Sequence, residues 1–330
     1  MIFGGGYDVQ EDAVPPATSA NTMGRAVYVV NGETGTVVSW FGTGGPGTLL
    51  SGAMSYAIPS DVTAINSDLD AQNYLDRIYV GDMGGNVWRF DINDVVPGNW
   101  QGKLLATLSA AAGPKRKLFF PPAAVKQINP ERFDAVYIGS GDREHPRLTT
   151  TTTPATTTDV FAMIMDRDVG LAMSGASTAS LVGGDFIQIA NSNLTGVVLG
   201  DLTTKKGWYR DLDDGEKVVN SPTVFFQRLR FGTYAPLSQT NACTPPGEGR
   251  LNEIDALSAG LFNLNAADGL TPTDRYYSGF ITRGYVSTGQ IVVIGKNVYH
   301  IVVSDARLKA NLVGSIGNAT KIYWYMEPEQ

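Results

Sequence analysis

The stretch that decides the fold is DRIYVGDMGGNVWRFD, at residues 76–91. Ile78 and Val80 stand before the turn sequence GDMGG, and Trp88 and Phe90 stand after it. β-Branched and aromatic residues on both sides of a glycine-rich turn are typical of an antiparallel hairpin. The stretch therefore predicts two strands joined by a tight turn.

Similar pairs of apolar runs recur along the chain, each with a Gly- or Asp-rich turn between its halves. They lie at residues 24–41, 76–91, 133–146 with 160–168, 228–236 with 249–260, and 290–306. Imperfect repetition of this kind is typical of a β-propeller, whose blades are small sheets that bury their faces against one another. At roughly 40 to 50 residues a blade, the chain predicts about seven blades. Two tandem sandwiches are the alternative, but no linker of distinct composition divides residues 1–330, so we expect a single all-β domain.

The composition supports strands and limits the range of partners. Glycine accounts for 38 of 330 residues and charged residues for only 17%, which favours tightly turned strands over helices. The net charge of −7 argues against nucleic acid and anionic membranes as partners. No apolar run reaches the length of a membrane helix. The chain opens directly on a predicted strand, MIFGGGYD, so we expect a domain of a longer protein whose N-terminal region is absent.

Two stretches interrupt the repeats and predict loop insertions. The sequence from Leu148 to Asp159 is polar and of low complexity, and its Thr-rich part, residues 149–158, predicts a surface loop. From Leu237 to Gly249, Pro245 and Pro246 among small residues predict a second segment without regular structure. This second segment contains Cys243, the single cysteine of the chain, which we interpret as a spectator thiol.

The segment DLDAQNYLD, at residues 68–76, places oxygen-bearing groups at alternate positions immediately before the hairpin. Calcium prefers six to eight oxygen ligands, and ligands at loop positions 1, 3, 5, 7 and 9 can surround it, the seventh through its backbone carbonyl. Here these positions are Asp68, Asp70, Gln72, Tyr74 and Asp76. The loop is not an EF-hand, because Asn73 and Tyr79 replace the required Gly and Glu. A solvated acidic turn is the alternative to the calcium site.

Other motifs have simpler interpretations. The G-x-G-x-x-G of Gly42, Gly44 and Gly47 follows a predicted strand, but Pro46 argues against the helix that a dinucleotide site needs. We therefore interpret it as a loop between blades. The short basic runs, residues 114–117 and 205–206, predict solvated loop charges.

Two acidic clusters remain as candidates. GDREHP, from Gly141 to Pro146, gathers Asp142, Arg143, Glu144 and His145, and four consecutive residues cannot all point one way. We expect a turn with a local contact from Asp142 to Arg143 or to the backbone rather than a catalytic cluster. DLDDGE, from Asp211 to Glu216, lacks sustained alternation and is a weaker cation candidate.

Taken in order, several segments resemble the C-terminal domain of the PilY family, the tip-associated adhesins of type IV pili. They are residues 2–8, 24–35, 68–91, 136–146 and 207–236, and the loop around Cys243. The resemblance runs from Ile2 to about Gly260 and implies a modified β-propeller related in shape to the quinoprotein dehydrogenases.

The resemblance also implies a function. In the family, a D-x-[DN]-x-D-x-x-x-D loop binds Ca²⁺, and its occupancy regulates pilus extension against retraction. Carried over, the ligands are the side chains of Asp68, Asp70, Gln72 and Asp76 and the carbonyl of Tyr74. Gln72 departs from the usual carboxylate, and one charge fewer should weaken binding. Cys243 has no partner within the chain, so any disulfide would need another molecule or the absent region.

The partners implied are minor pilins at the pilus tip and a host or abiotic surface ligand, with an extracellular location at the pilus tip or outer membrane surface of a Gram-negative bacterium. No enzymatic activity is expected. One alternative is a quinoprotein-type dehydrogenase that binds pyrroloquinoline quinone over the propeller axis. Such enzymes commonly use a vicinal cysteine pair, which one cysteine cannot supply. The other alternative is a structural propeller whose loop binds no calcium.

Overall fold

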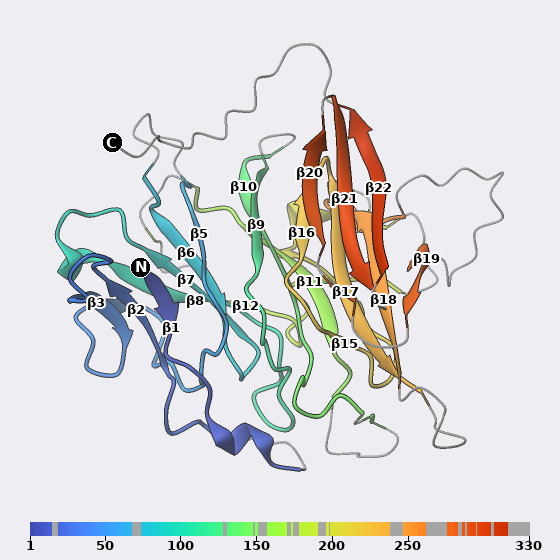
Figure 1. The fold of residues 1–330 in the computed structure, drawn as a ribbon. Helices are drawn as coiled ribbons and strands as arrows, with labels where there is room; N and C mark the ends of the chain where they lie inside the picture. Colours follow the sequence, from blue (N-terminus) through green and yellow to red (C-terminus); the bar gives the residue numbers. More distant parts are fainter. Residues whose placement is uncertain are drawn as a thin grey trace.

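A computed structural model gives the fold of the chain (Figure 1). It describes residues 1–14, 19–67, 74–127, 131–147, 149–150, 157–169, 173, 178–190, 196–197, 199–237, 247–261, 276–282, 286–287, 289–294, 296–304 and 307–315. Within these residues the regular structure is strand, apart from short 3-10 turns at Val9–Asp12, Pro97–Asn99 and Leu199–Thr203. The predicted all-β class is therefore confirmed. In the same part of the chain, no helix has the length and apolar character that crossing a membrane requires.

Apart from β12, the strands of the first two sheets come from the N-terminal part of the chain. The first has the order β1-β2-β3, with β1 (Ile2–Gly4), β2 (Ala26–Val30) and β3 (Val37–Gly42). The second has the order β12-β8-β7-β6-β5, with β4 beside β8. Its strands are β4 (Thr48–Leu49), β5 (Thr63–Ile65), β6 (Arg77–Gly81), β7 (Asn86–Asp91), β8 (Gln101–Thr107) and β12 (Ala179–Ser180).

The remaining sheets follow in chain order. The third, β13-β14-β11-β10-β9, contains β9 (Ala123–Gln127), β10 (Phe133–Gly139), β11 (Val160–Asp166), β13 (Ile187–Gln188) and β14 (Gly207–Asp211). The fourth, β15-β17-β18-β19 with β16 beside β17, contains β15 (Lys217–Val218), β16 (Thr223–Phe225), β17 (Arg228–Pro236), β18 (Gly247–Asp255) and β19 (Tyr276–Thr282). The fifth is β20 (Gln290–Ile294), β21 (Asn297–Ser304) and β22 (Arg307–Ser315).

The first four sheets pack face to face in the order in which the chain forms them (Figure 1). Successive side chains of a strand point to opposite faces of its sheet, so one sheet can pack against a neighbour on each face. In β6, Ile78 and Val80 join the cluster with the first sheet, whereas Tyr79 joins the cluster with the third. In β10, Val136 faces the second sheet and Tyr137 faces the fourth. We call the two interfaces of the third sheet the second–third junction and the third–fourth junction.

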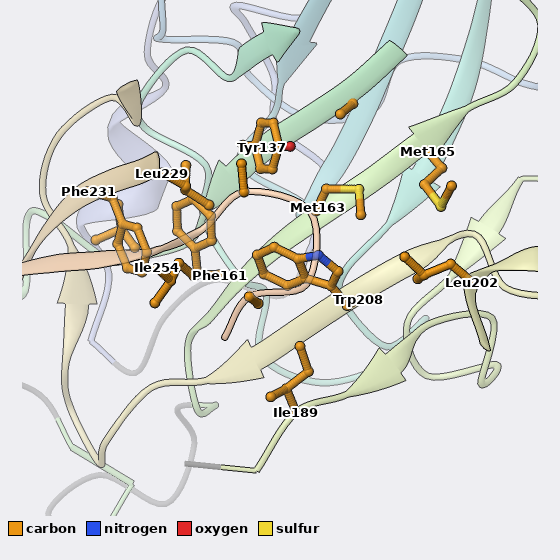
Figure 2. Packing of buried hydrophobic residues seen from close by; sticks show 14 of the residues in the cluster. Tyr137, Phe161, Met163, Met165, Ile189, Leu202, Trp208, Leu229, Phe231 and Ile254 are labelled. Carbon is orange, nitrogen blue, oxygen red and sulfur yellow. The ribbon is translucent and has the colours of Figure 1, made fainter. Parts of the chain in front are cut away.

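The third–fourth junction is packed with aromatic and aliphatic side chains (Figure 2). Phe161 of β11 stacks on Phe231 of β17 with ring centroids 3.7 Å apart. Trp208 of β14 is fully buried beside them and donates its indole N–H to the carbonyl of Leu257, at 2.8 Å. The burial of this apolar surface holds the two sheets together.

All five predicted strand pairs are confirmed as antiparallel partners: β2 with β3, β6 with β7, β10 with β11, β17 with β18, and β20 with β21. The prediction that regular structure is absent as far as Gly249 is wrong at its end. Strand β18 begins at Gly247, which pairs with Pro236, because β17 and β18 form a long hairpin. Closure of the sheets into about seven blades stays a prediction.

Both predicted insertions lie mainly outside the described residues. The Thr-rich segment connects β10 to β11, and its residues 151–156 are not described. At its start, Thr150 donates its backbone N–H to Asp214 at 2.7 Å. Cys243 falls in the undescribed part of the second insertion.

Candidate metal centre

The predicted calcium loop connects β5 to β6, and its two ends are fastened to each other. Asp76 donates its backbone N–H to the carbonyl of Ile65 at 3.0 Å, and its own carbonyl accepts from Ile92 at 2.8 Å. Its carboxylate accepts the backbone N–H of Ser67 at 2.5 Å. The loop therefore leaves and rejoins the sheet at one place, and the last predicted ligand directs its carboxylate back to the residue where the loop begins.

Only part of the predicted ligand set can be placed. Tyr74 is 72% exposed, and the Asp76 side chain is half-buried. Asp68, Asp70 and Gln72 lie outside the described residues. In the described part of the chain, no group of three or more His, Cys, Asp or Glu is arranged to hold a metal. The calcium site thus stays a prediction, and it needs the carboxylates of residues 68–73.

The residues next to the loop connect it to the neighbouring sheet. Ser67 is fully buried, and its hydroxyl donates to Asp134 Oδ2 on β10 at 2.7 Å. Arg77, which follows Asp76, donates to the same Asp134 oxygen at 2.8 Å. The other oxygen, Asp134 Oδ1, is buried and has no hydrogen-bond partner in the described structure. Both ends of the loop are therefore anchored across the second–third junction.

Arg77 and Asp134 belong to a larger set of buried charges, which we call the charge network. Its members are Arg77, Arg89, Asp91, Lys103, Asp134, Asp166 and Asp168. Arg89, fully buried, contacts Asp91 at 2.6 Å and Asp166 at 2.9 Å. Six of these charges lie on strand faces that are turned to the second–third junction, and Asp168 follows the end of β11.

Electrostatics favour the charged forms of the two arginines of the network. Burial by itself would lower the pKa of Arg77, but the Tyr79 hydroxyl and the surrounding carboxylates outweigh it and raise the pKa above its ordinary value. The same competition between burial and the Asp91 and Asp166 carboxylates raises the pKa of Arg89. These seven side chains hold three cations against four carboxylates, so their formal charge is −1 beside a loop that is itself acidic.

The GDREHP segment forms the predicted turn with a local backbone contact, in which His145 donates its backbone N–H to the carbonyl of Asp142 at 3.2 Å. The Asp142 carboxylate lies 2.9 Å from His145 Nδ1 and 3.0 Å from Lys117 Nζ, and these contacts take the place of the predicted pair with Arg143. The prediction that residues 114–117 are solvated is wrong for Lys117, which is 1% exposed and also donates to the carbonyl of Glu11. Lys117 is buried because the Glu11 carboxylate and carbonyl and the Asp142 carboxylate, from two distant segments, converge on it.

The carboxylates of the DLDDGE segment do not converge on a cation site. Glu216 is buried and accepts from Thr233, Asp213 contacts Arg250 at 2.9 Å, and Asp214 accepts from Thr150. The G-x-G-x-x-G segment likewise has the predicted loop structure. It follows β3 and leads into the short strand β4, with no helix between them.

Sequence reasoning missed the charge network. A usable signal was present: charged residues occupy alternate positions of strands that are otherwise apolar, as at Arg89 and Asp91 in β7. An isolated charge in such a strand is costly to bury, so several of them predict mutual pairing. Comparison with known proteins adds no relative, because no family model matches the chain and no curated protein is significantly similar to it. The resemblance to the PilY family stays a prediction.

Proposed function

We propose that this chain is a calcium-responsive, non-enzymatic module of a type IV pilus, of the PilY type. It would bind Ca²⁺ through Asp68, Asp70, Gln72, Asp76 and the carbonyl of Tyr74. Minor pilins at the pilus tip and a surface ligand would be its partners, outside the cell. The observation that supports the proposal best is the anchoring of the candidate loop: Ser67 and Arg77, on its two sides, bind the same oxygen of Asp134 in the next sheet.

This anchoring suggests how calcium would act. Without the ion, the loop carboxylates repel one another, and the ion removes this repulsion when it binds. Asp76 would then be held by both the metal and the backbone N–H of Ser67. Because Ser67 and Arg77 reach across to Asp134, ordering of the loop would stiffen the second–third junction. A module under load from an extended pilus would in this way respond to calcium outside the cell.

The packing of the sheets is compatible with the propeller that the resemblance implies. Each of the first three sheets packs on the sheet that follows it, as blades do. A propeller would supply a rigid platform for recognition. We propose about seven blades, with the loop at the junction of two of them.

The decisive experiment is a calcium titration by calorimetry on chelator-stripped protein. Saturable binding is expected, with a Kd of about 10⁻⁴ to 10⁻³ M as in other extracellular modules. Asp70→Asn should weaken binding at least about tenfold, because it removes a loop carboxylate. The matched control is Asp61→Asn, which changes an exposed aspartate just before β5 in the same way and should leave binding unchanged. Magnesium should compete poorly, because it demands a smaller octahedral site.

Two outcomes would contradict the proposal. Absence of heat up to several millimolar calcium would mean that the loop holds no ion and that the structural alternative is correct. Equal loss of binding in both variants would mean that the loop is not the site. If binding follows the expected pattern, cells with Asp70→Asn as their only copy should extend pili independently of calcium.

A further inference from the structure

A cavity of about 460 Å³ opens where the edges of the third and fourth sheets meet, beside the third–fourth junction. Its walls come from β9 and β10 on one side, and from the β16–β17 turn and the residues after β18 on the other. The lining residues are Val125, Gln127, Tyr137, Val224, Phe225, Phe226, Gln227, Asp255, Ala256, Leu257 and Ser258. The volume is in the range of pockets for small molecules.

The polar groups of the cavity include two with unused hydrogen-bonding capacity. Tyr137 is 3% exposed, yet its hydroxyl makes no hydrogen bond within the described structure. Asp255 Oδ1 accepts from Ser258 N at 2.7 Å, Ser258 Oγ and Leu257 N, whereas Oδ2 accepts no hydrogen bond in the same part of the chain. A donor and an anionic acceptor are thus available to a ligand in the cavity.

The electrostatics of the cavity favour a cation. No Lys or Arg is among the lining residues, and Arg228, which lies opposite Asp255 in the β17–β18 ladder, is paired with Glu253. Burial, with Asp255 as the second cause, raises the pKa of Tyr137, so its hydroxyl stays protonated and able to donate. The rings of Phe225 and Phe226, with centroids 4.4 Å apart, form an aromatic wall. Aromatic faces attract organic cations.

The backbone at the rim is strained in a way that suggests use. Phe226 and Gln227 have φ of 49° and 60°, a left-handed conformation at both central positions of the hairpin turn. Such turns strongly favour Asn-Gly, and bulky residues there are unusual. Phe226 is also 47% exposed, so burial does not explain its presence. Residues kept under such strain cluster at ligand-binding positions.

We propose that this cavity binds a small organic ammonium ion with an apolar body, with its charge on Asp255 and its body against Phe225 and Phe226. The hydroxyl of Tyr137 donates to any acceptor that the ligand carries. The inference is independent of calcium, because the cavity shares no residue with the predicted loop.

The probe for the test is phenethylammonium, followed by saturation-transfer NMR and calorimetry on the intact chain. It is compared with 2-phenylethanol, which is neutral, and 3-phenylpropionate, which is anionic. Phenethylammonium should bind saturably, the alcohol about tenfold more weakly, and the carboxylate not detectably. Equal affinity for phenethylammonium and 2-phenylethanol would contradict the proposal that the ligand is a cation. Absence of phenethylammonium binding would contradict the proposal that the cavity is a binding site.

Variants locate the binding. Asp255→Asn retains an oxygen that can accept from Leu257 and Ser258 in the turn, so the variant should fold. It should bind phenethylammonium about tenfold more weakly. Phe226→Ala removes a half-exposed ring and should also weaken binding of phenethylammonium. Asp61→Asn serves as the control and should bind like the wild type. Unchanged affinity in both cavity variants would place any binding elsewhere and refute the proposal.

Discussion

The two junctions of the third sheet are built from different chemistry, although they share the strands β10 and β11. Towards the fourth sheet these strands present Tyr137 and Phe161, which pack in a cluster of rings and aliphatic chains. Towards the second sheet they present, beside apolar residues, Asp134 and Asp166, which bind Arg77 and Arg89. Apolar burial depends little on geometry, whereas paired charges are favourable in one arrangement only. The polar junction is therefore the one that an ion in the proposed loop would influence.

The largest expected effect comes from breaking the polar junction. Asp166→Asn leaves Arg89 buried without its full charge partner, and it should lower the free energy of unfolding by about 3–5 kcal/mol. Denaturant titration measures this loss. Glu131→Gln is the matched control, because Glu131 is 44% exposed in its pair with Arg167 and should cost less than about 1 kcal/mol.

A second comparison tests whether only the polar junction is coupled to the loop. Phe231→Ala removes the ring stacked on Phe161 and should cost a similar amount, about 3–5 kcal/mol. The calcium affinity should nevertheless change in Asp166→Asn and stay unchanged in Phe231→Ala. If both variants bind calcium like the wild type, the proposed coupling between loop and junction is absent.

The response to pH should be set by two buried carboxylates outside the charge network. Burial raises the pKa of Asp82 to about 6, in spite of hydrogen bonds from Trp88 and Asn86. Burial likewise raises the pKa of Asp159 to about 6, with Lys217 opposing it. Between about pH 4 and pH 6 the folded state holds protons that the unfolded state has released, so stability should fall as pH rises through this window.

Each of these groups should contribute about 3 kcal/mol to that decline. Chemical denaturation at several pH values measures the slope. The amide oxygen of an Asp159→Asn variant can still accept from Ser140. This variant should therefore lose the contribution of Asp159 to the decline in stability and keep the contribution of Asp82. A slope that is the same in this variant would show that Asp159 does not titrate in the window.

Strand pairing could be predicted from the sequence, because hairpins are local and their alternation and turn residues are visible. The pairing of residues 76–91 around GDMGG is an example. The charge network could not be assembled in this way. Arg77 and Asp134 are 57 positions apart, and their contact depends on which sheets become neighbours. Lys117 was misjudged for the same reason, since its partners Glu11 and Asp142 come from distant segments.

The candidate calcium loop was also a local pattern, and its spacing could be read directly. Its anchoring could not be predicted from the sequence, because nothing near Ser67 in the sequence indicates its hydrogen bond to Asp134. The cavity at Tyr137 has no sequence signal of its own either. Its lining comes from segments around residues 125, 137, 225 and 256, which only the packing of the third and fourth sheets brings together.

The smallest expected effect tests whether the rim of the apolar junction is kept for binding rather than for stability. Replacement of Phe226 and Gln227 by Asn and Gly suits the left-handed backbone of the turn, so it should raise the free energy of unfolding by about 1–2 kcal/mol. It also removes one of the two rings of the aromatic wall, so binding of phenethylammonium should weaken.

Phe226→Ala separates the two contributions. It removes the ring without relieving the backbone strain, so it should lose affinity and gain no stability. Denaturant titration and NMR binding on the same samples measure both quantities. A more stable Asn-Gly protein with unchanged affinity would mean that the strained turn has no part in the site. A turn that is stabilised only at the expense of binding would explain why the chain keeps Phe226 and Gln227 where Asn-Gly fits better.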